Sequence, residues 1–169
     1  MNYQIKQLPV MHITGHTTIF QGNPKERKQQ QHDFMVNGDI RFLRYALQGM
    51  AGDCHTEYCV ISNVAENAFH FTVGTEIPTY FTTHLEKTVG TYAEKLQTLC
   101  IPAQIYVSVE TNQGINYMNE QAELYKQMVE EWLPTSGYLL KNAPELSILH
   151  HQKENSYVEV LIPIEERER

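Results

Sequence analysis

The clearest pattern of apolar and polar positions lies in the last third of the chain. Apolar side chains recur there at three- and four-residue spacing, at Leu124, Met128, Val129 and Trp132. This spacing predicts an amphipathic helix over 119–133, and we expect Pro134 to end it because proline lacks a backbone N–H and its ring clashes with the preceding turn. Two β-favouring runs follow at 145–151 and 156–164. In the second run apolar residues take the even positions, so Tyr157 and Glu159 should point away from the helix.

The same order of elements occurs earlier in the chain, at an offset of about 90 residues, which indicates an internal repeat. An aliphatic-proline pair opens a β-rich run in each half, Leu8-Pro9 in the first and Ile101-Pro102 in the second. In the first half we expect a strand at 3–18, a helix at 39–48 ended by Gly49, and hairpin strands at 56–62 and 68–77. Each half is therefore a βαββ unit.

These units predict a single α+β domain over 1–169, with halves at 1–78 and 97–166 and a linker at 79–96. The duplicated βαββ units should pair through their first strands into an antiparallel sheet, with helices on one face and a concave ligand groove on the other. Asn23-Pro24 is a plausible helix start, so 21–32 is either an extra surface helix or a loop. Leu85, Val89, Tyr92 and Leu96 give the linker near-helical spacing, interrupted by Gly90.

Charge and composition narrow the function classes. The 169-residue chain carries a formal charge of −7, and its only dense basic stretch is 25–28, so nucleic acid is not an expected partner. It has no apolar run long enough to cross a membrane and no signal-peptide pattern, which makes the cytoplasm the default location. Cys54, Cys59 and Cys100 fit buried thiols better than a disulfide framework. Cys54-His55 with Cys59 and the pair His150-His151 are weak metal patterns, and we expect no metal or cofactor.

Alternation of side chains predicts which residues face the groove. In the second half the groove-facing set should be Tyr106, Ser108, Glu110, Glu145, Ser147, Leu149, Tyr157, Glu159 and Leu161, and in the first half Met11, Tyr58 and His70, with Trp132 and Tyr138 closing one end. The ligand contacts we predict from these are Tyr58, His70, Tyr106, Ser108, Trp132, Tyr138, Ser147, Leu149, Tyr157 and Glu159. A tyrosine on a half-buried strand is more often a packing residue, and Trp132 in a helix stripe is more often core. A register error of one residue would replace every member of the set.

Three short motifs carry a resemblance to a known family. They are the string from Trp132 to Tyr138, the Pro-x-Leu strand start at Pro144, and the terminal Val-x-Ile-Pro-Ile from Val160 to Ile164. Their order resembles GyrI-like domains, the effector-binding modules of bacterial AraC-type and BmrR-type transcription regulators and of stand-alone gyrase-inhibitor-like proteins. Family members carry a glutamate and a tyrosine where this chain has Ser147 and Leu149. Since that glutamate meets cationic ligands in the family, the resemblance leaves a preference for cations open.

The resemblance implies a small-molecule-binding domain, acting as a stand-alone sensor or sequestering protein. Its expected ligand is a small hydrophobic or aromatic molecule, with a cationic one left open. Two alternatives remain. One is a gyrase-inhibitor-like module in which the acidic surface binds a cationic protein such as gyrase or a regulator. The other is a hydrolase of small electrophiles that uses Tyr106 and Glu159 as acid and base, although no residue is assigned a catalytic role.

Overall fold

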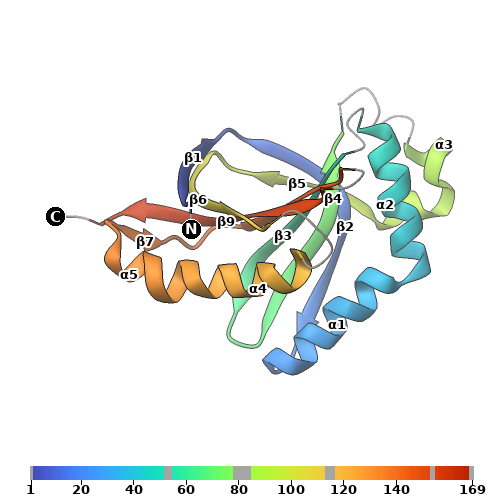
Figure 1. Cartoon of the computed structure of the whole chain (residues 1–169). Helices are drawn as coiled ribbons and strands as arrows, with labels where there is room; N and C mark the ends of the chain where they lie inside the picture. Colours follow the sequence, from blue (N-terminus) through green and yellow to red (C-terminus); the bar gives the residue numbers. More distant parts are fainter. Residues whose placement is uncertain (1, 52–54, 78–84, 113–116, 153–154, 168–169) are drawn as a thin grey trace.

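The computed structural model describes residues 2–51, 55–77, 85–112, 117–152 and 155–167. Within these residues nine strands pair antiparallel in the order β1-β6-β9-β8-β3-β4-β2-β5, and β7 pairs with β9 (Figure 1). The strands are β1 Gln4–Leu8, β2 Met11–Gln21, β3 Thr56–Ala65, β4 Ala68–Glu76, β5 Leu96–Ile101, β6 Gln104–Glu110, β7 Tyr138–Leu140, β8 Glu145–His150 and β9 Tyr157–Glu166. The helical segments are α1 Pro24–Val36, α2 Gly38–Met50, α3 Leu85–Val89, η2 Gly90–Lys95, α4 Tyr117–Gln127, η3 Met128–Trp132 and α5 Leu133–Thr135.

The two halves pair through their first strands, as the sequence predicts, but each of these strands is broken at its proline. Pro9 separates β1 from β2, and Pro102 separates β5 from β6. Proline cannot donate a backbone hydrogen bond, so it interrupts the ladder. The broken strands still run alongside each other, since Leu8 pairs with Gln104 and Met11 pairs with Ile101. The predicted single strand over 3–18 is therefore wrong in its continuity.

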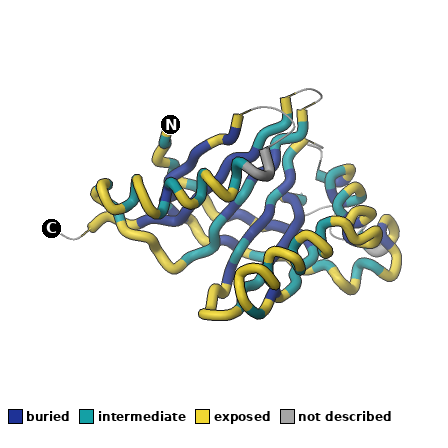
Figure 2. Tube along the Cα trace, turned by 60° about the horizontal axis from the view of Figure 1, so that its bottom comes forward, coloured by how far each residue is buried: buried dark blue, intermediate teal, exposed yellow. Residues whose placement is uncertain are grey.

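Each half then adds a hairpin, β3–β4 in the first and β8–β9 in the second. β4 pairs with β2 and β9 pairs with β6, while β3 and β8 pair with each other in the centre of the ladder. This arrangement confirms the α+β class and the duplicated βαββ order. The strands carry most of the buried positions, and the helices are exposed along much of their length (Figure 2).

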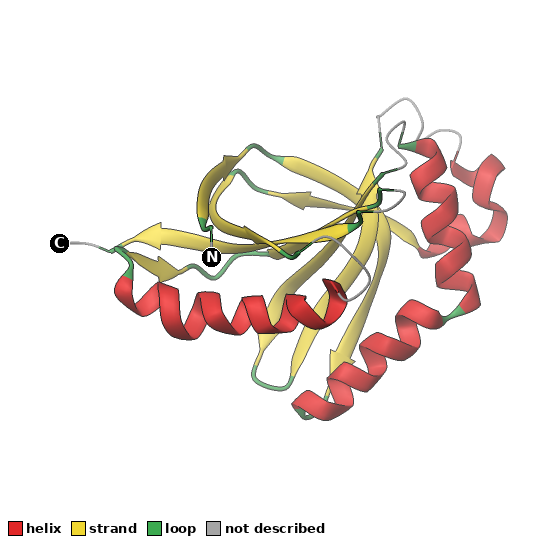
Figure 3. Ribbon diagram, in the orientation of Figure 1, coloured by secondary structure: helices red, strands yellow, loops and turns green. Residues whose placement is uncertain are grey.

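Helices cover one face of the sheet (Figure 3). The main hydrophobic core lies there, between the apolar stripe of α4 and η3 and the even-numbered residues of β9 from Val158 to Ile164. The predicted amphipathic helix is confirmed, but Pro134 does not end it. η3 is a π-helical turn in which the Leu133 N–H donates to the Met128 carbonyl, five residues earlier. Because this turn shifts the hydrogen-bond pattern just before Pro134, the helix continues as α5 to Thr135.

The first-half helices also differ in detail from the predictions. The extra helix at Asn23-Pro24 is confirmed as α1, whose first turn is closed by a capping box between Asn23 and Glu26, and none of its residues is buried. Gly49 lies inside α2 rather than ending it. The linker is helical over α3 and η2, whose residues Val89 and Tyr92 pack against α2.

The sheet face opposite the helices is not an open wall along its whole length. Its middle is filled by a second hydrophobic cluster from both halves: Met11, Ile13, Val60, Ile101, Tyr106, Leu146, Ile148 and Leu161. The protein's own side chains therefore fill the middle of the face on which the sequence predicts the ligand groove. The strong bends at the two prolines bring opposite parts of the sheet together, so apolar side chains on this face bury one another instead of remaining exposed.

Candidate functional site

The predicted site residues lie on both faces of the sheet. Strand pairing places Tyr58, His70, Tyr106, Ser108, Tyr157 and Glu159 on the face opposite the helices. Ser147 and Leu149 lie on the helix-covered face, together with Trp132 and Tyr138. The predicted orientation of β8 is therefore wrong by one residue. Leu146 and Ile148 pack in the second cluster while Leu149 packs in the first, so both faces of β8 are apolar and its sequence does not show which face is which.

On the face opposite the helices, Glu159 is the centre of a polar cluster. Its carboxylate accepts hydrogen bonds from Lys6 Nζ at 2.5 Å and Ser108 Oγ at 2.6 Å. Burial alone would raise the pKa of Glu159, but the neighbouring His150 side chain, the hydrogen bonds from Lys6 and Ser108 and the positive charge of Lys6 lower it to about 2. His150 Nε2 lies 3.7 Å from the same carboxylate, and the His150 ring stacks on Tyr157 with centroids 4.4 Å apart. Glu159 thus anchors β1 to the sheet.

The remaining predicted residues on this face are held by other protein groups. Tyr106 is fully buried, and its hydroxyl donates to the Pro144 carbonyl at 3.0 Å. Burial also raises the pKa of Tyr106 to about 12. A hydroxyl in this position cannot reach a substrate, which leaves the suggested Tyr106 and Glu159 pair without an accessible acid. Tyr58 contacts Glu76, and His70 lies near the β3–β4 turn, 3.3 Å from Asn63.

Trp132 and Tyr138 meet at the end of the long helix. Their rings stack with centroids 6.1 Å apart, and Tyr3 lies 5.4 Å from Trp132 on the other side. All three rings are partly buried against the main core. Trp132 and Tyr138 therefore lie on the helix-covered face and not on the face where the sequence predicts the groove; their stack joins the N-terminal segment to η3 and β7.

A more promising group lies where α4 crosses β8 on the helix-covered face. Gln121 and Tyr125 are one helical turn apart and both reach down to the strand. Gln121 Nε2 donates to Ser147 Oγ at 2.6 Å, and the Tyr125 hydroxyl donates to Glu145 Oε1 at 3.0 Å. Burial raises the pKa of Glu145, although the hydrogen bond from Tyr125 lowers it in part. Burial and the nearby carboxylate raise the pKa of Tyr125 as well.

The opposite side of this region is aromatic. Beside β8, strand β3 places Ile61 next to Glu145, and α1 brings Phe34 onto the sheet. Phe34 belongs to an edge-to-face cluster with Phe20 and Phe71, with ring centroids 5.8–5.9 Å apart. In Figures 1 and 2 the β3–β4 hairpin runs between α4 on one side and α1 on the other. We call this region the interhelical surface; it consists of Phe34, Ile61, Gln121, Tyr125, Glu145 and Ser147, all partly exposed.

Sequence reasoning found only part of the interhelical surface. Ser147 was among the predicted contacts, and Glu145 was assigned to the opposite face. Phe34, Gln121 and Tyr125 were missed. The sequence does indicate Gln121 and Tyr125 as a pair: they are four residues apart, so they lie on one side of the helix, next to its apolar stripe.

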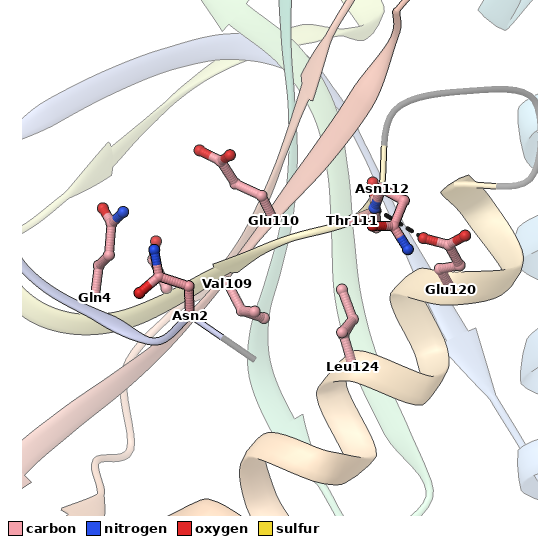
Figure 4. A pocket seen from close by; sticks show the side chains of 9 residues that line it. Asn2, Gln4, Val109, Glu110, Thr111, Asn112, Glu120 and Leu124 are labelled. Atoms are coloured by element: carbon pink, nitrogen blue, oxygen red, sulfur yellow. Dashed lines mark hydrogen bonds between the residues drawn. The ribbon is translucent and has the colours of Figure 1, made fainter.

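A pocket of about 440 Å³ lies elsewhere, beyond the end of β1 (Figure 4). It is lined by Asn2, Gln4, Ser108, Val109, Glu110, Thr111, Asn112, Glu120 and Leu124. Across the described ranges, no three His, Cys, Asp or Glu side chains are grouped so that they could hold a metal ion. Cys54 of the weak cysteine-histidine pattern is outside those ranges, Cys59 is buried as expected, and Cys100 is exposed, contrary to the expectation.

The fold is similar to those of several solved structures. The structure of SAV2435 bound to tetraphenylphosphonium has a TM-score of 0.73 and 14% sequence identity, and the match covers 98% of this chain and 94% of that one. A putative transcription regulation protein from Staphylococcus aureus MU50 has a TM-score of 0.67 and 14% identity over 98% and 99% of the two chains. The integron cassette protein VCH_CASS2 from the mobile metagenome of Vibrio cholerae has a TM-score of 0.60 and 12% identity over 96% and 95%. At these identities the likeness concerns the fold.

Sequence comparisons establish the family. No curated protein sequence matches this chain. No helix in the described ranges is long and apolar enough to cross a membrane. The family model named Cass2, integron-associated effector binding protein, matches residues 4–164. Together with the fold, this match confirms the resemblance to GyrI-like effector-binding domains: the chain belongs to the family of integron-associated effector-binding proteins.

Proposed function

We propose that the interhelical surface binds a small aromatic effector that carries a positive charge, and that the protein acts as a cytoplasmic sensor or sequestering protein for it. One observation carries the choice of site, namely the unusual environment of Glu145. Three of the six residues of β8, Leu146, Ile148 and Leu149, are buried and apolar, yet the Glu145 carboxyl group lies on the helix-covered face of the same strand, beside the partly exposed Ile61 of β3. The free thiols of Cys59 and Cys100 favour a reducing compartment.

The electrostatics of Glu145 favour a cationic ligand. Its described hydrogen-bond partner is the neutral hydroxyl of Tyr125, and no described Lys, Arg or His side chain forms an ion pair with it. A partly buried carboxylate without a neighbouring cation is destabilised, which is why its pKa is raised. A bound cation would supply the missing charge and stabilise the ionised form.

The surroundings of Glu145 favour an aromatic or hydrophobic ligand. Phe34 and Ile61 are partly exposed apolar side chains on the α1 side of the interhelical surface, opposite the polar groups of α4 and β8. Apolar walls with a few placed polar groups are typical of small-molecule sites, and aromatic rings also attract cations. Tetraphenylphosphonium, the ligand in the SAV2435 structure, combines both properties, which supports the proposal and supplies a probe.

Calorimetric titration with tetraphenylphosphonium tests the proposal. We expect binding by the wild type and a loss of about tenfold or more in Glu145→Gln, because the phosphonium loses its charge attraction to a partly buried carboxylate; tenfold corresponds to about 1.4 kcal/mol. The matched control is Glu130→Gln, which removes an exposed carboxylate from η3, the turn that continues α4. Affinity should also rise with pH above the ordinary carboxyl range, since the proton on Glu145 competes with the cation. Equal affinity in wild type and Glu145→Gln would show that the site is elsewhere.

A further inference from the structure

The pocket beyond the end of β1 exposes part of a strand edge. The β1–β6 ladder stops at the pair Gln4 and Ser108, whereas β6 continues to Glu110. On its other edge β6 remains paired with β9 as far as Glu110 and Glu159, and the Thr111 N–H donates to the Val158 carbonyl at 2.9 Å. Backbone groups of neighbouring residues in an antiparallel strand point to opposite edges. The N–H and carbonyl of Glu110 therefore point toward the edge that β1 has left.

Side chains that bind peptide groups surround this edge. In Figure 4, Asn2 and Gln4 lie at one end of the pocket and Asn112 and Glu120 at the other, with Val109 and Glu110 of β6 between them. Amide side chains both donate and accept hydrogen bonds, so they can pair with the N–H and carbonyl groups of an extended chain. Val109 and Leu124 supply an apolar part of the lining. The volume of about 440 Å³ falls within the range typical of ligand sites, roughly 300–1,000 Å³.

The charge of the pocket indicates what kind of chain would fit. Glu110 and Glu120 line it, and its described lining residues include no basic side chain. Glu120 uses one carboxylate oxygen to accept from the Asn112 N–H at 2.9 Å, while Glu110 is exposed at the open edge. Positive charge on a bound segment would meet both carboxylates. The formal charge of −7 for the chain attracts such a segment from a distance as well.

We propose that this pocket is a docking site for a short, extended basic peptide segment of a partner protein, which adds to β6 as a strand beyond the end of β1. Backbone hydrogen bonds to Glu110 would set the register, as in other cases of strand addition. Lysine or arginine side chains on alternate residues would share the face of the sheet on which Glu110 lies, and the residues between them would face Val109 and Leu124. This site is separate from the interhelical surface, so the proposal does not depend on the effector or its charge.

Titration of the full chain with two capped pentapeptides tests this proposal. The first has the sequence Val-Lys-Val-Lys-Val, and the second is the same peptide with its backbone amides N-methylated, so that it keeps its charge but cannot donate. We expect the first to bind and to shift the amide resonances of residues 108–111, and the second to bind at least tenfold more weakly. Equal affinity for both peptides would mean simple charge attraction and would overturn strand addition, as would the absence of binding.

Charge is tested separately by two matched variants. Glu110→Gln should weaken binding of the first peptide by about threefold, the size expected for an exposed ion pair. Glu66→Gln removes an exposed carboxylate on the β3–β4 turn and should leave the affinity unchanged. An equal loss in both variants would refute a local role for Glu110. Neither variant should alter tetraphenylphosphonium binding, so failure of one proposal is distinguishable from failure of the other.

Discussion

The pair of Arg44 and Glu57 attaches α2 to the centre of the sheet, and its removal gives a sharp test of the structure. Glu57 is almost completely buried on β3. Its two carboxylate oxygens accept from Arg44 Nε at 2.9 Å and Arg44 Nη2 at 2.6 Å, and Gln48 Nε2 lies 3.4 Å away. Substituting Arg44→Met would leave a buried carboxylate without its cation. Breaking a buried ion pair in this way costs about 3–5 kcal/mol, and the partial exposure of Arg44 puts the expected loss near the lower end.

Urea and thermal unfolding measure this loss directly. A loss of about 3 kcal/mol corresponds to a decrease in Tm of roughly 6–12 °C for a chain of this size. Arg41→Met, which removes an exposed charge from the same helix, should change Tm little. The double variant Arg44→Met with Glu57→Leu should regain most of the stability, because it no longer buries a lone charge. If Arg44→Met were no worse than Arg41→Met, water would have to reach Glu57, and the packing of α2 described above would be wrong.

Three further predictions concern acid stability, close packing and helix capping. Because the pKa of Glu159 is lowered from 4.5 to about 2, its contribution to stability is complete above pH 4.5 and is lost as the pH falls toward 2. Lys6→Met should reduce this loss by about 1 kcal/mol, measured by urea unfolding at neutral and acid pH, since His150 and Ser108 also lower the pKa and Lys6 is partly exposed. Gly15→Ala should lower the free energy of unfolding by roughly 1–3 kcal/mol, since the added Cβ would lie 2.1 Å from a backbone carbonyl oxygen of β4. Its control is Gly49→Ala, which has open space around it and should raise the stability of α2 by up to about 1 kcal/mol. Asn23→Ala removes the cap of α1 and should cost about 1 kcal/mol, measured as loss of helical circular dichroism and a lower urea midpoint.

Periodicity made most elements of the fold predictable. The stripe from Leu124 to Trp132 and the alternation from Tyr157 to Ile164 each have one apolar face, so both the element and its orientation could be predicted. The helix ends were less predictable. Gly49 and Pro134 disfavour a helix locally, but the hydrogen bonds of the neighbouring turns let each helix continue. Pro134 is tolerated only because the π-helical turn before it has already shifted the hydrogen-bond pattern.

The candidate site was harder to predict because it depends on contacts distant in sequence. β8 is buried on both faces, so alternation could not show that Glu145 and Ser147 face the helices. The closure of the opposite face depends on pairing between β3 and β8, which no local pattern reveals. The hydrogen bonds from Gln121 and Tyr125 to β8 join residues at least 20 positions apart, so no local sequence pattern predicts them.

The exchange of first strands between the halves has a consequence for how the protein assembles. Among the described strands β1 pairs with β6 of the second half, while β2 pairs with β4 of the first half and with β5. Neither half can complete its own ladder, so a chain nicked between the halves should keep its two fragments bound, and either fragment made alone should expose unpaired edges and aggregate. Folding of the N-terminal half during synthesis would then have to wait until β6 has emerged from the ribosome.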